Sequence, residues 1–358
     1  MGRIRYAVAG SGWRALFYVR AAQKLPEHFE LTGVLCRTRE KAAAFSAAHG
    51  VPAVDTLDAL LAAKPDFVVS CVSKAGMADM VMQLLERGVP ALSETPLAVE
   101  LDTLRRLLET QRRTGTPLDM AEQYFLYPSH QARQALIARG LLGQVTYCDL
   151  SMMHDYHGIS MLRAYLGEET GPVRIDAKRH VSPIVVTGGR GGYVTDGEMG
   201  EEQRVLATLD YGDGRVGLYD FAGTQYHSAI RSNHVRILGT RGEIADDEVR
   251  YLTADNRPLL GRLIVQRDGI TGTIRAIDFG GERVYVNPFR TDVEMTEDEI
   301  AVAAVLMRMR DHLAGGAPNT PFAFRDSYLA IAMREAAQAG ACVTADALAW
   351  DAPEAAAR

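Results

Sequence analysis

The chain has 358 residues, 47% of them hydrophobic and 23% charged, which is long enough for two folded domains. Its net charge of −6 argues against nucleic acid as the main partner, and no apolar run reaches the ~18 residues that a membrane span requires. The four cysteines form no CxxC pair and the N-terminus runs directly into a strand-like segment, so we expect reduced thiols, no signal peptide and a cytoplasmic location.

The first 120 residues alternate short apolar runs with helical patterns. We expect strands at residues 4–9, 31–35, 67–72, 89–93 and near 118, and helices at residues 13–24, 40–49, 57–63, 75–87 and 99–113. Thr38 and Thr56 are placed to cap two of these helices. This alternation predicts an α/β domain with a doubly wound parallel sheet of the Rossmann type, which we place at residues 1–122.

The pattern changes after residue 122. We expect a helix at residues 129–139, a strand at 145–152, a helix at about 157–166, mostly strands to about 290, and closing helices at 298–313 and 325–339. Turn signals at residues 211–215 and 239–242 predict hairpins. Residues 123–358 should therefore form an α+β domain built on a largely antiparallel open sheet. Residues 188–200 are glycine-rich and predict a mobile loop, and residues 353–358 predict a frayed end.

A glycine-rich turn joins the first strand to the first helix. The segment Gly10-Ser-Gly-Trp-Arg-Ala15 has the GxGxxG/A spacing of a dinucleotide fingerprint. Gly10 would allow the tight turn, Gly12 the close approach of a pyrophosphate, and Ala15 the packing of the helix on the sheet. The helix N-terminus would face the phosphate charge. We therefore expect cofactor contacts along this turn, from Gly10, Ser11, Gly12, Trp13 and Arg14.

The end of the second strand indicates which dinucleotide is bound. NAD sites usually place a carboxylate there for the ribose 2′-hydroxyl, but this chain has Arg37-Thr38-Arg39. A guanidinium binds a phosphate through a bidentate fork, so Arg37 with Thr38 favours NADP over NAD. The alternative is that Arg37 and Arg39 are solvated loop charges and that NAD binds loosely.

With these motifs the sequence resembles the Gfo/Idh/MocA oxidoreductase family over nearly its whole length. The resemblance also includes the segment from Gly88 to Ala98 with Glu94-Thr95-Pro96, the stretch Gly140-Leu-Leu-Gly-Gln-Val, and the helix near residues 157–167. It implies an N-terminal dinucleotide domain in which Glu94 helps to bind the cofactor. It also implies a second domain for substrate binding and oligomerisation, and chemistry on sugars, cyclitols or related polyols.

The sequence departs from the family pattern at its usual proton-transfer positions. The family typically has Glu-Lys-Pro after the fourth strand, whereas this chain has Thr95 in place of the lysine. The family histidine of the second domain matches His157, but its usual aspartate neighbours are Met153 and Ser160. A family histidine after the third strand corresponds to Met77.

Hydride transfer also needs a group that exchanges a proton with the reacting oxygen. His157 is the candidate, in the cluster His154-Asp-Tyr-His157, where Asp155 or His154 could orient it. Thr95 can donate a hydrogen bond without supplying charge, and Lys74 could replace the missing lysine from the end of the third strand. Each residue also has a plain alternative, such as a helix-start histidine or a lysine in solvent.

Several polar residues are candidates for substrate contact. Gln123 and Tyr124 lie at the expected domain junction and, with His154, could line the pocket. Arg190 could reach an anionic substrate, although a surface arginine is the simpler interpretation. His154 and His157 have an i, i+3 spacing, but the sequence offers no convincing third ligand, so we expect no metal site.

Three functions remain open on these grounds. The first is an NADP-preferring oxidoreductase, with NAD as the alternative cofactor, acting on a sugar-like or other small hydroxyl or carbonyl compound. The second is an imine or conjugated-substrate reductase, or a redox-neutral enzyme that cycles its cofactor. The third is a non-catalytic NAD(P)-binding sensor. An exposed sheet in the second domain predicts a homodimer or homotetramer.

Overall fold

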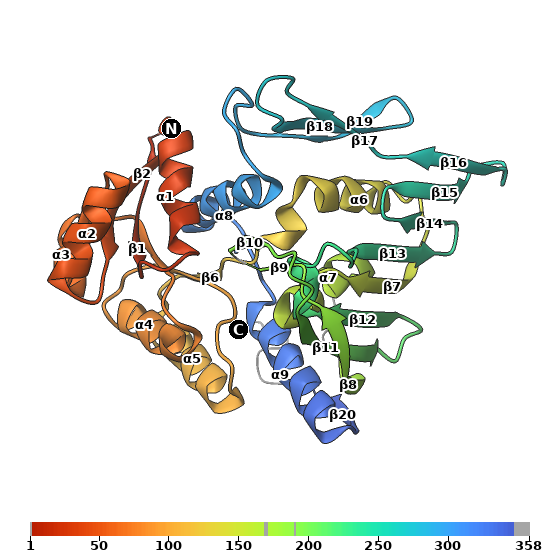
Figure 1. Ribbon diagram of the computed structural model, residues 1–358, viewed down its shortest axis with the longest axis horizontal. Coiled ribbons are helices and arrows are strands. Elements are labelled where there is room, and N and C mark those ends of the chain that lie inside the picture. Colours follow the sequence, from red (N-terminus) through yellow and green to blue (C-terminus); the bar gives the residue numbers. More distant parts are fainter. Residues whose placement is uncertain (1, 168–170, 190, 347–358) are drawn as a thin grey trace, which may run out of the picture. The chain divides into compact units, whose positions relative to one another are not determined.

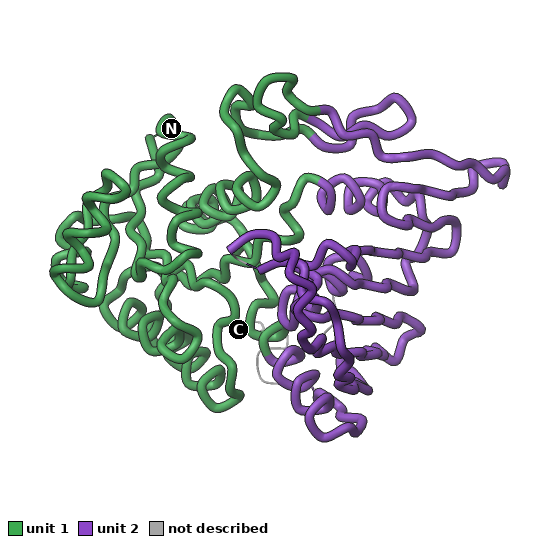
Figure 2. Tube along the Cα trace, in the orientation of Figure 1, with its two compact units in different colours: residues 1–128, 267–275, 286–327 green, residues 129–266, 276–285, 328–358 purple. Residues whose placement is uncertain are grey.

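The computed structural model describes residues 2–167, 171–189 and 191–346 (Figure 1). The chain divides into two compact units (Figure 2). Unit 1 comprises residues 1–128, 267–275 and 286–327, and unit 2 comprises residues 129–266, 276–285 and 328–358. Arg190 and the expected frayed end at 353–358 lie outside the described residues. The functional boundary that we expect after residue 122 stays a prediction.

The described strands of unit 1 form a six-stranded parallel sheet with the order β3-β2-β1-β4-β5-β6. The sheet contains β1 (Ile4–Ala9), β2 (Phe29–Leu35), β3 (Ala53–Val54), β4 (Phe67–Ser70), β5 (Ala91–Ser93) and β6 (Leu118–Met120). All four residues of β4 are buried, as expected for a parallel strand covered on both faces. The prediction of a doubly wound Rossmann-type sheet is therefore confirmed.

Helices surround this sheet. They are α1 (Ala15–Lys24), α2 (Arg39–His49), α3 (Leu57–Ala62), α4 (Lys74–Glu86), α5 (Leu101–Thr114), the short 3₁₀ helix η1 (Tyr124–Leu126) and α8 (Glu297–Leu313). Thr38 and Thr56 cap α2 and α3 through their side-chain oxygens, as predicted. Helix α4 packs against α5, and α8 packs along α1 although more than 270 residues separate them in the sequence.

The described strands of unit 2 form a nine-stranded sheet with the order β16-β15-β14-β13-β7-β12-β11-β8-β20. Its strands are β7 (Val145–Ser151), β8 (Val173–Val185), β11 (Met199–Asp210), β12 (Val216–Ala222), β13 (His234–Gly239), β14 (Gly242–Ala245), β15 (Glu248–Leu252), β16 (Pro258–Arg262) and β20 (Cys342–Ala345). Among the described pairs only β7 and β12 run parallel, so the predicted largely antiparallel sheet is confirmed. The hairpins predicted at residues 211–215 and 239–242 join β11 to β12 and β13 to β14.

Unit 2 also contains helical segments, and a smaller sheet spans segments of both units. The helices are α6 (Pro128–Ala138), α7 (Asp155–Leu166), the 3₁₀ helix η2 (Gly223–Tyr226) and α9 (Ala323–Ala339), and the smaller sheet has β17 (Ile264–Arg267), β18 (Ile274–Phe279) and β19 (Glu282–Val286). Helix α7 packs on β7 and β12. The opposite side of the nine-stranded sheet, which we call the open face, carries many half-buried or exposed side chains: on β7, Cys148 and Leu150 are fully buried, whereas Tyr147 and Asp149 are not.

The glycine-rich segment at residues 188–200 contains short strands that the sequence did not predict. Strands β9 (Gly188–Gly189) and β10 (Gly192–Tyr193) form a short antiparallel ladder, and β11 already begins at Met199. The loop prediction is therefore wrong for these strand residues, whereas residues 194–198 lie in no strand or helix, as a loop requires. The reason is backbone pairing: β8 and β11 pair continuously from Met199 with Val185 to Asp210 with Arg174, so strand structure extends into a segment that lacks an apolar pattern.

Candidate functional site

The carboxyl edge of the unit 1 sheet has a topological switch point. From β1 the chain continues to β2 on one side of β1, whereas β4 lies on the other side. In open parallel sheets ligands bind outside the carboxyl ends of the strands at such a point. The turn after β1 and the segments after β4 and β5 meet this edge, so most of the residues singled out in the N-terminal part of the sequence lie on it.

The turn at residues 10–15 has both glycines that the fingerprint requires. Each of them is suited to its position for a different reason. Gly10 has φ +120°, and a Cβ atom there would lie 2.5 Å from the carbonyl oxygen of Cys71. A Cβ at Gly12 would meet no protein atom within 4 Å, so this position faces open space. Ala15 is fully buried at the start of α1. The turn therefore fits a phosphate that approaches the Gly12 backbone at a helix N-terminus.

Arg14 is held inside unit 1 by two carboxylates. Its Nε donates to Glu94 Oε1 at 2.6 Å and its Nη1 donates to Asp298 Oδ2 at 2.9 Å. Burial lowers the pKa of Arg14, but Glu94 and Asp298 outweigh this and raise the pKa well above its ordinary value. Gln123, in the amide orientation that satisfies both of its ends, accepts from Arg14 Nη2 at 3.3 Å. The guanidinium thus joins α1, the segment after β5 and α8.

Glu94 is the buried centre of this network. Its Oε1 also accepts from the Tyr18 hydroxyl at 2.6 Å, and its Oε2 accepts from the Thr95 backbone N–H at 3.2 Å. Burial and the negative charge of Glu94 raise the pKa of Cys71 well above its ordinary value, so this thiol stays protonated. The sequence did not single out Tyr18 or Asp298, because nothing in the pattern marks a contact across 76 or 284 residues.

Two exposed arginines follow the end of β2. Arg37 and Arg39 lie on either side of Thr38, whose Oγ1 accepts from the Lys41 backbone N–H at 3.3 Å and so caps α2. Neither arginine forms an ion pair with any residue that the structure describes. Two unpaired guanidinium groups beside a helix N-terminus favour an anionic ligand at this strand end.

Lys74 and Thr95 follow neighbouring strands. Lys74 is exposed at the start of α4, directly after β4, and Thr95 is buried in the turn after β5. Since Ser70 of β4 pairs with Ser93 of β5, both residues belong to the same edge of the sheet. Two further candidates follow β6: Gln123 is buried, and Tyr124 stacks on Tyr127 with ring centroids 4.9 Å apart. Trp13 is exposed and packs edge-on against Phe17.

The remaining predicted residues form a second group, in unit 2, at the start of α7. His157 is 5% exposed, and its ring lies 4.9 Å from that of His154 and 4.4 Å from that of Tyr156. Asp155 has φ +39°, a left-handed conformation that is uncommon outside glycine and concentrates at functional sites. Asp155 Oδ2 lies 3.9 Å from Arg334 Nη1.

Three tyrosines that the sequence did not single out surround this histidine cluster. The Tyr226 hydroxyl lies 2.6 Å from His154 Nδ1, and the Tyr156 hydroxyl lies 2.9 Å from His154 Nε2. The Tyr219 hydroxyl accepts from the Asp155 backbone N–H at 2.9 Å. Tyr156 could have been found, because it lies inside the quoted motif. Tyr219 and Tyr226 lie more than 60 residues downstream, beyond any local signal.

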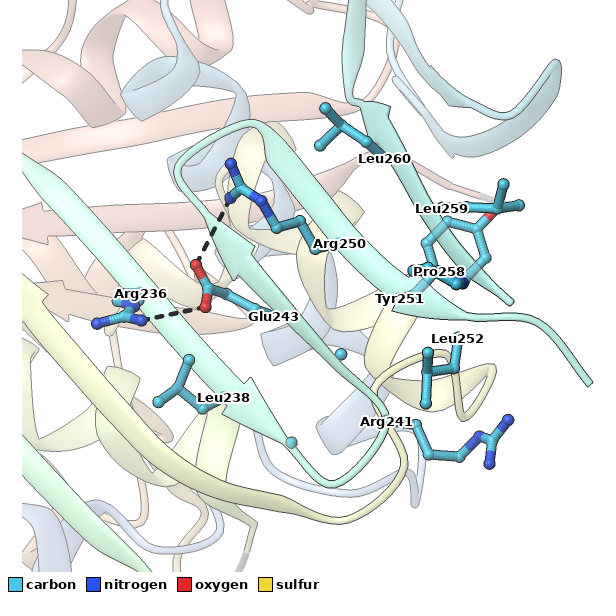
Figure 3. Close-up of a pocket in the computed structure, with 12 residues that line it drawn as sticks. Arg236, Leu238, Arg241, Glu243, Arg250, Tyr251, Leu252, Pro258, Leu259 and Leu260 are labelled. Atoms are coloured by element: carbon cyan, nitrogen blue, oxygen red, sulfur yellow. Dashed lines mark hydrogen bonds and ion pairs between the residues drawn. The ribbon is translucent and has the colours of Figure 1, made fainter. Parts of the chain in front are cut away.

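A groove of about 590 Å³ lies on unit 2 away from these residues (Figure 3). It is lined by side chains of β13 to β16, among them Leu238, Leu252 and Leu260. None of the predicted site residues lines it. Among the described residues, no three His, Cys, Asp or Glu side chains are grouped to hold a metal ion. None of the described helices combines the length and apolar character of a membrane span.

A family model and two proteins of Bacillus subtilis match this chain in sequence. Residues 4–121 match the family model described as oxidoreductase family, NAD-binding Rossmann fold (GFO_IDH_MocA). The chain is 23% identical to scyllo-inositol 2-dehydrogenase (NADP(+)) IolU of Bacillus subtilis (strain 168) over 269 residues, which cover 69% of this chain and 76% of IolU. It is 24% identical to YteT of the same organism over 159 residues, which cover 42% of this chain and only 37% of YteT.

A solved structure shares the fold over nearly the whole chain. It is an oxidoreductase from Agrobacterium radiobacter in complex with NAD+, L-tartaric acid and magnesium, with a TM-score of 0.70 and 16% identity. The alignment covers 95% of this chain and 98% of that one. The likeness concerns the fold of both units.

Proposed function

Because this chain belongs to the Gfo/Idh/MocA family of NAD(P)-dependent oxidoreductases, we propose that it transfers hydride between NADP and a sugar-like or other polyhydroxylated small molecule. The observation that carries the proposal is the turn at residues 10–15. Gly10 makes the turn sterically possible, and Gly12 leaves its outer side open beside the N-terminus of α1. IolU is named for scyllo-inositol, and the Agrobacterium protein was solved with L-tartaric acid. Both compounds carry more than one hydroxyl group, which supports this substrate class.

We propose that Gly10, Ser11, Gly12 and Trp13 contact the dinucleotide. We also propose that Arg14 and Glu94 support this turn from the interior of unit 1. Arg14 is held between Glu94 and Asp298, so its guanidinium contributes mainly by fixing the first turn of α1. The dinucleotide, when bound, would supply or accept the hydride. Lys74 and Thr95, on the same sheet edge, would hold the reacting oxygen, with Lys74 supplying the positive charge that Thr95 lacks.

We assign proton transfer to the cluster at the start of α7. His157 is the candidate from the sequence, with Asp155 and His154 beside it, and Gln123 and Tyr124 remain candidates for substrate contact.

All four cysteines are free, which supports the expected cytoplasmic location, because disulfides are rare in reducing compartments. We also propose that unit 2 self-associates into a dimer or tetramer through its open face.

The preference for NADP is tested by removing one arginine at the end of β2. In Arg37→Ser, we expect the Kd for NADPH to rise about 10–100-fold, because charge-assisted hydrogen bonds to a phosphate contribute roughly 1.5–3 kcal/mol. The Kd for NADH should change less than about twofold, since NADH has no 2′-phosphate. Isothermal titration calorimetry measures both constants.

Arg106→Ser is the matched control for this experiment. Arg106 is exposed on α5 and forms no ion pair with the described residues, so its removal changes the net charge equally but not the strand end. An equal loss of NADH and NADPH affinity in Arg37→Ser would contradict the NADP preference. No binding of either dinucleotide by the unmodified protein would contradict the proposed function itself.

A further inference from the structure

We propose that Asp298, in the first turn of α8, is a positioning residue for the dinucleotide site. It holds Arg14, and through Arg14 it fixes the turn at residues 10–15 to which the pyrophosphate would bind. This inference rests on the proposed oxidoreductase function and deepens it, because it adds a residue that the fingerprint does not contain. Arg14 and Asp298 both belong to unit 1, although 284 residues separate them in the sequence.

Arg14 connects the turn to the interior of unit 1. It precedes α1 with helical backbone angles, φ −67° and ψ −33°, and its carbonyl oxygen accepts from the Phe17 backbone N–H at 3.1 Å. Its Nε donates to Glu94 Oε1 at 2.6 Å, and its Nη1 donates to Asp298 Oδ2 at 2.9 Å. A guanidinium is planar, so contacts at two of its nitrogens fix its position and its orientation together. If one contact is lost, the group can rotate about the other.

The turn is attached to the rest of unit 1 at both of its ends. At its start, the Gly10 backbone N–H donates to the Leu35 carbonyl oxygen of β2 at 3.0 Å. At its end, Arg14 is held by the two carboxylates. Between these points the outer side is open, since a Cβ at Gly12 would meet no protein atom within 4 Å. The geometry of the turn therefore depends on its two attachments, and Asp298 supplies part of the second.

Asp298 is itself held in place by the start of α8. Thr296 and Glu299 form a capping box, in which Thr296 Oγ1 accepts from the Glu299 N–H at 3.2 Å and the Thr296 N–H donates to Glu299 Oε2 at 3.1 Å. Asp298 lies between these two residues, where the partial positive charge of a helix N-terminus stabilises a carboxylate. The side chains of Arg14 and Asp298 are 18% and 21% exposed, so water screens this pair less than it screens a surface ion pair.

The next residue of α8 makes a second contact with α1, away from the turn. Glu299 Oε1 accepts from Arg20 Nε at 2.7 Å, and its Oε2 accepts from Lys24 Nζ at 2.8 Å. Arg20 and Lys24 lie six and ten residues beyond Arg14, or about 9 and 15 Å along the helix axis. Glu299 therefore stabilises the far part of α1, whereas Asp298 acts at the end that carries the turn.

The charge of Asp298 and its positioning role predict opposite effects on binding. A negative charge beside the turn disfavours phosphate groups, so the removal of the charge alone would strengthen dinucleotide binding. The loss of positioning weakens it, because a phosphate is bound well only where the backbone N–H groups of a helix N-terminus point at it. We expect positioning to dominate, since Asp298 contacts Arg14 directly while its field across the solvated turn is screened.

Calorimetry of variants that remove only the charge tests this inference. In Asp298→Asn, which keeps the size of the side chain, we expect the Kd for NADPH to rise about 5–20-fold, as for the weakening of hydrogen bonds to charged groups. The Kd for NADH should rise by the same factor, because both dinucleotides contain the pyrophosphate. Asp298→Glu, which keeps the carboxylate, should bind NADPH more tightly than Asp298→Asn does.

Glu299→Gln is the matched control on the same helix. It changes the net charge equally and weakens the contacts with Arg20 and Lys24, so we expect it to lower the free energy of unfolding at least as much as Asp298→Asn. Its Kd for NADPH should nevertheless change less than about twofold, because these contacts are distant from the turn. Urea denaturation measures the stability of each variant and shows that it is folded.

Three results would overturn the inference. The first is an unchanged or lower Kd for NADPH in Asp298→Asn. The second is a rise in Kd in both Asp298→Asn and Glu299→Gln that follows their loss of stability, because Asp298 would then have only a structural role. The third is weaker binding by Asp298→Glu than by Asp298→Asn.

Amide hydrogen exchange measured by NMR provides a readout without a ligand. The Ala15 and Leu16 N–H groups donate to the carbonyl oxygens of Gly12 and Trp13 in the first turn of α1. Their exchange should be at least about tenfold faster in Asp298→Asn, because this turn opens locally more often, and unchanged in Glu299→Gln. Equal exchange in the wild type and Asp298→Asn would contradict the positioning role.

The wild-type titration separates failure of this inference from failure of the proposed function. If the wild type binds NADPH and Asp298→Asn binds it equally well, the positioning role is wrong and the oxidoreductase function stands. If the wild type binds no dinucleotide, the proposed function is wrong and the positioning role falls with it.

Discussion

Gly10 and Gly12 lie two residues apart in one turn, but the chain needs them for different reasons. At Gly10 the constraint is internal, because its φ of +120° and the nearby Cys71 carbonyl exclude a side chain. At Gly12 the protein offers no obstacle, so any need for glycine comes from a ligand. The same motif therefore combines a folding requirement with a binding requirement.

Alanine substitutions separate these two requirements. We expect Gly10→Ala to lower the free energy of unfolding by about 2–4 kcal/mol, because it adds backbone strain to a steric clash. Gly12→Ala should change the free energy of unfolding by less than about 0.5 kcal/mol, as at an open surface position, yet weaken NADPH binding at least about tenfold. Urea denaturation and calorimetry measure the two effects. A stable Gly12→Ala protein with normal affinity would show that the pyrophosphate does not approach this backbone.

His130 makes stability depend on pH. It is fully buried on α6, next to Tyr165, with Arg133 Nη1 3.3 Å from its Nδ1. Burial, and secondly Arg133, lower the pKa of His130 well below its ordinary value. Below about pH 6.5 the unfolded chain therefore takes up a proton that the native His130 does not, and stability decreases as the pH falls.

We expect this residue alone to remove up to about 1.4 kcal/mol of stability for each pH unit below about 6.5. In His130→Asn, the difference in unfolding free energy between pH 7.5 and 5.5 should shrink accordingly. Urea denaturation at a fixed protein concentration measures it. His180→Asn is the control, because His180 is exposed on β8. An identical pH dependence in wild type and His130→Asn would contradict the assignment.

The sequence predicted helices and strands correctly where neighbouring residues determine them. Helices α2 and α3 begin at threonines whose side chains cap them, and α2 ends at Gly50 with φ +66°. The apolar runs of β1 and β4 are buried, as their composition indicates. The turns at residues 211–215 and 239–242 carry glycines and were predicted for the same reason.

Elements whose cause is distant were missed. Strand β20 is only four residues long, and it pairs with β8, more than 160 residues earlier. The two-residue β3 likewise depends on β2. The candidate site shows the same limit: the fingerprint and the strand-end arginines are local, whereas Asp298 reaches Arg14, and Tyr226 reaches His154, only through the tertiary fold.

The open face of unit 2 carries exposed side chains in the part of the chain that the structure describes. Register places Arg236, Glu243, Arg250 and Leu260 on this face, where Glu243 pairs with Arg236 at 3.1 Å and lies 3.7 Å from Arg250 (Figure 3). Leu259 and Leu260 are 47% and 63% exposed. Charges of both signs beside exposed leucines can complement the same surface of a second copy, as a two-fold interface requires.

A charge placed among these leucines tests the proposed self-association. We expect the wild type to have a mass of two or four times 39.1 kDa by light scattering after size-exclusion chromatography. Leu260→Arg should shift it toward the monomer, because a stable interface buries at least about 1,000 Å² and tolerates an unpaired central charge poorly. Ile270→Arg is the control, since Ile270 is 98% exposed but lies in a turn outside the groove. A wild-type monomer at micromolar concentration would contradict the proposal. An assembly that Leu260→Arg leaves intact would place the interface on another surface.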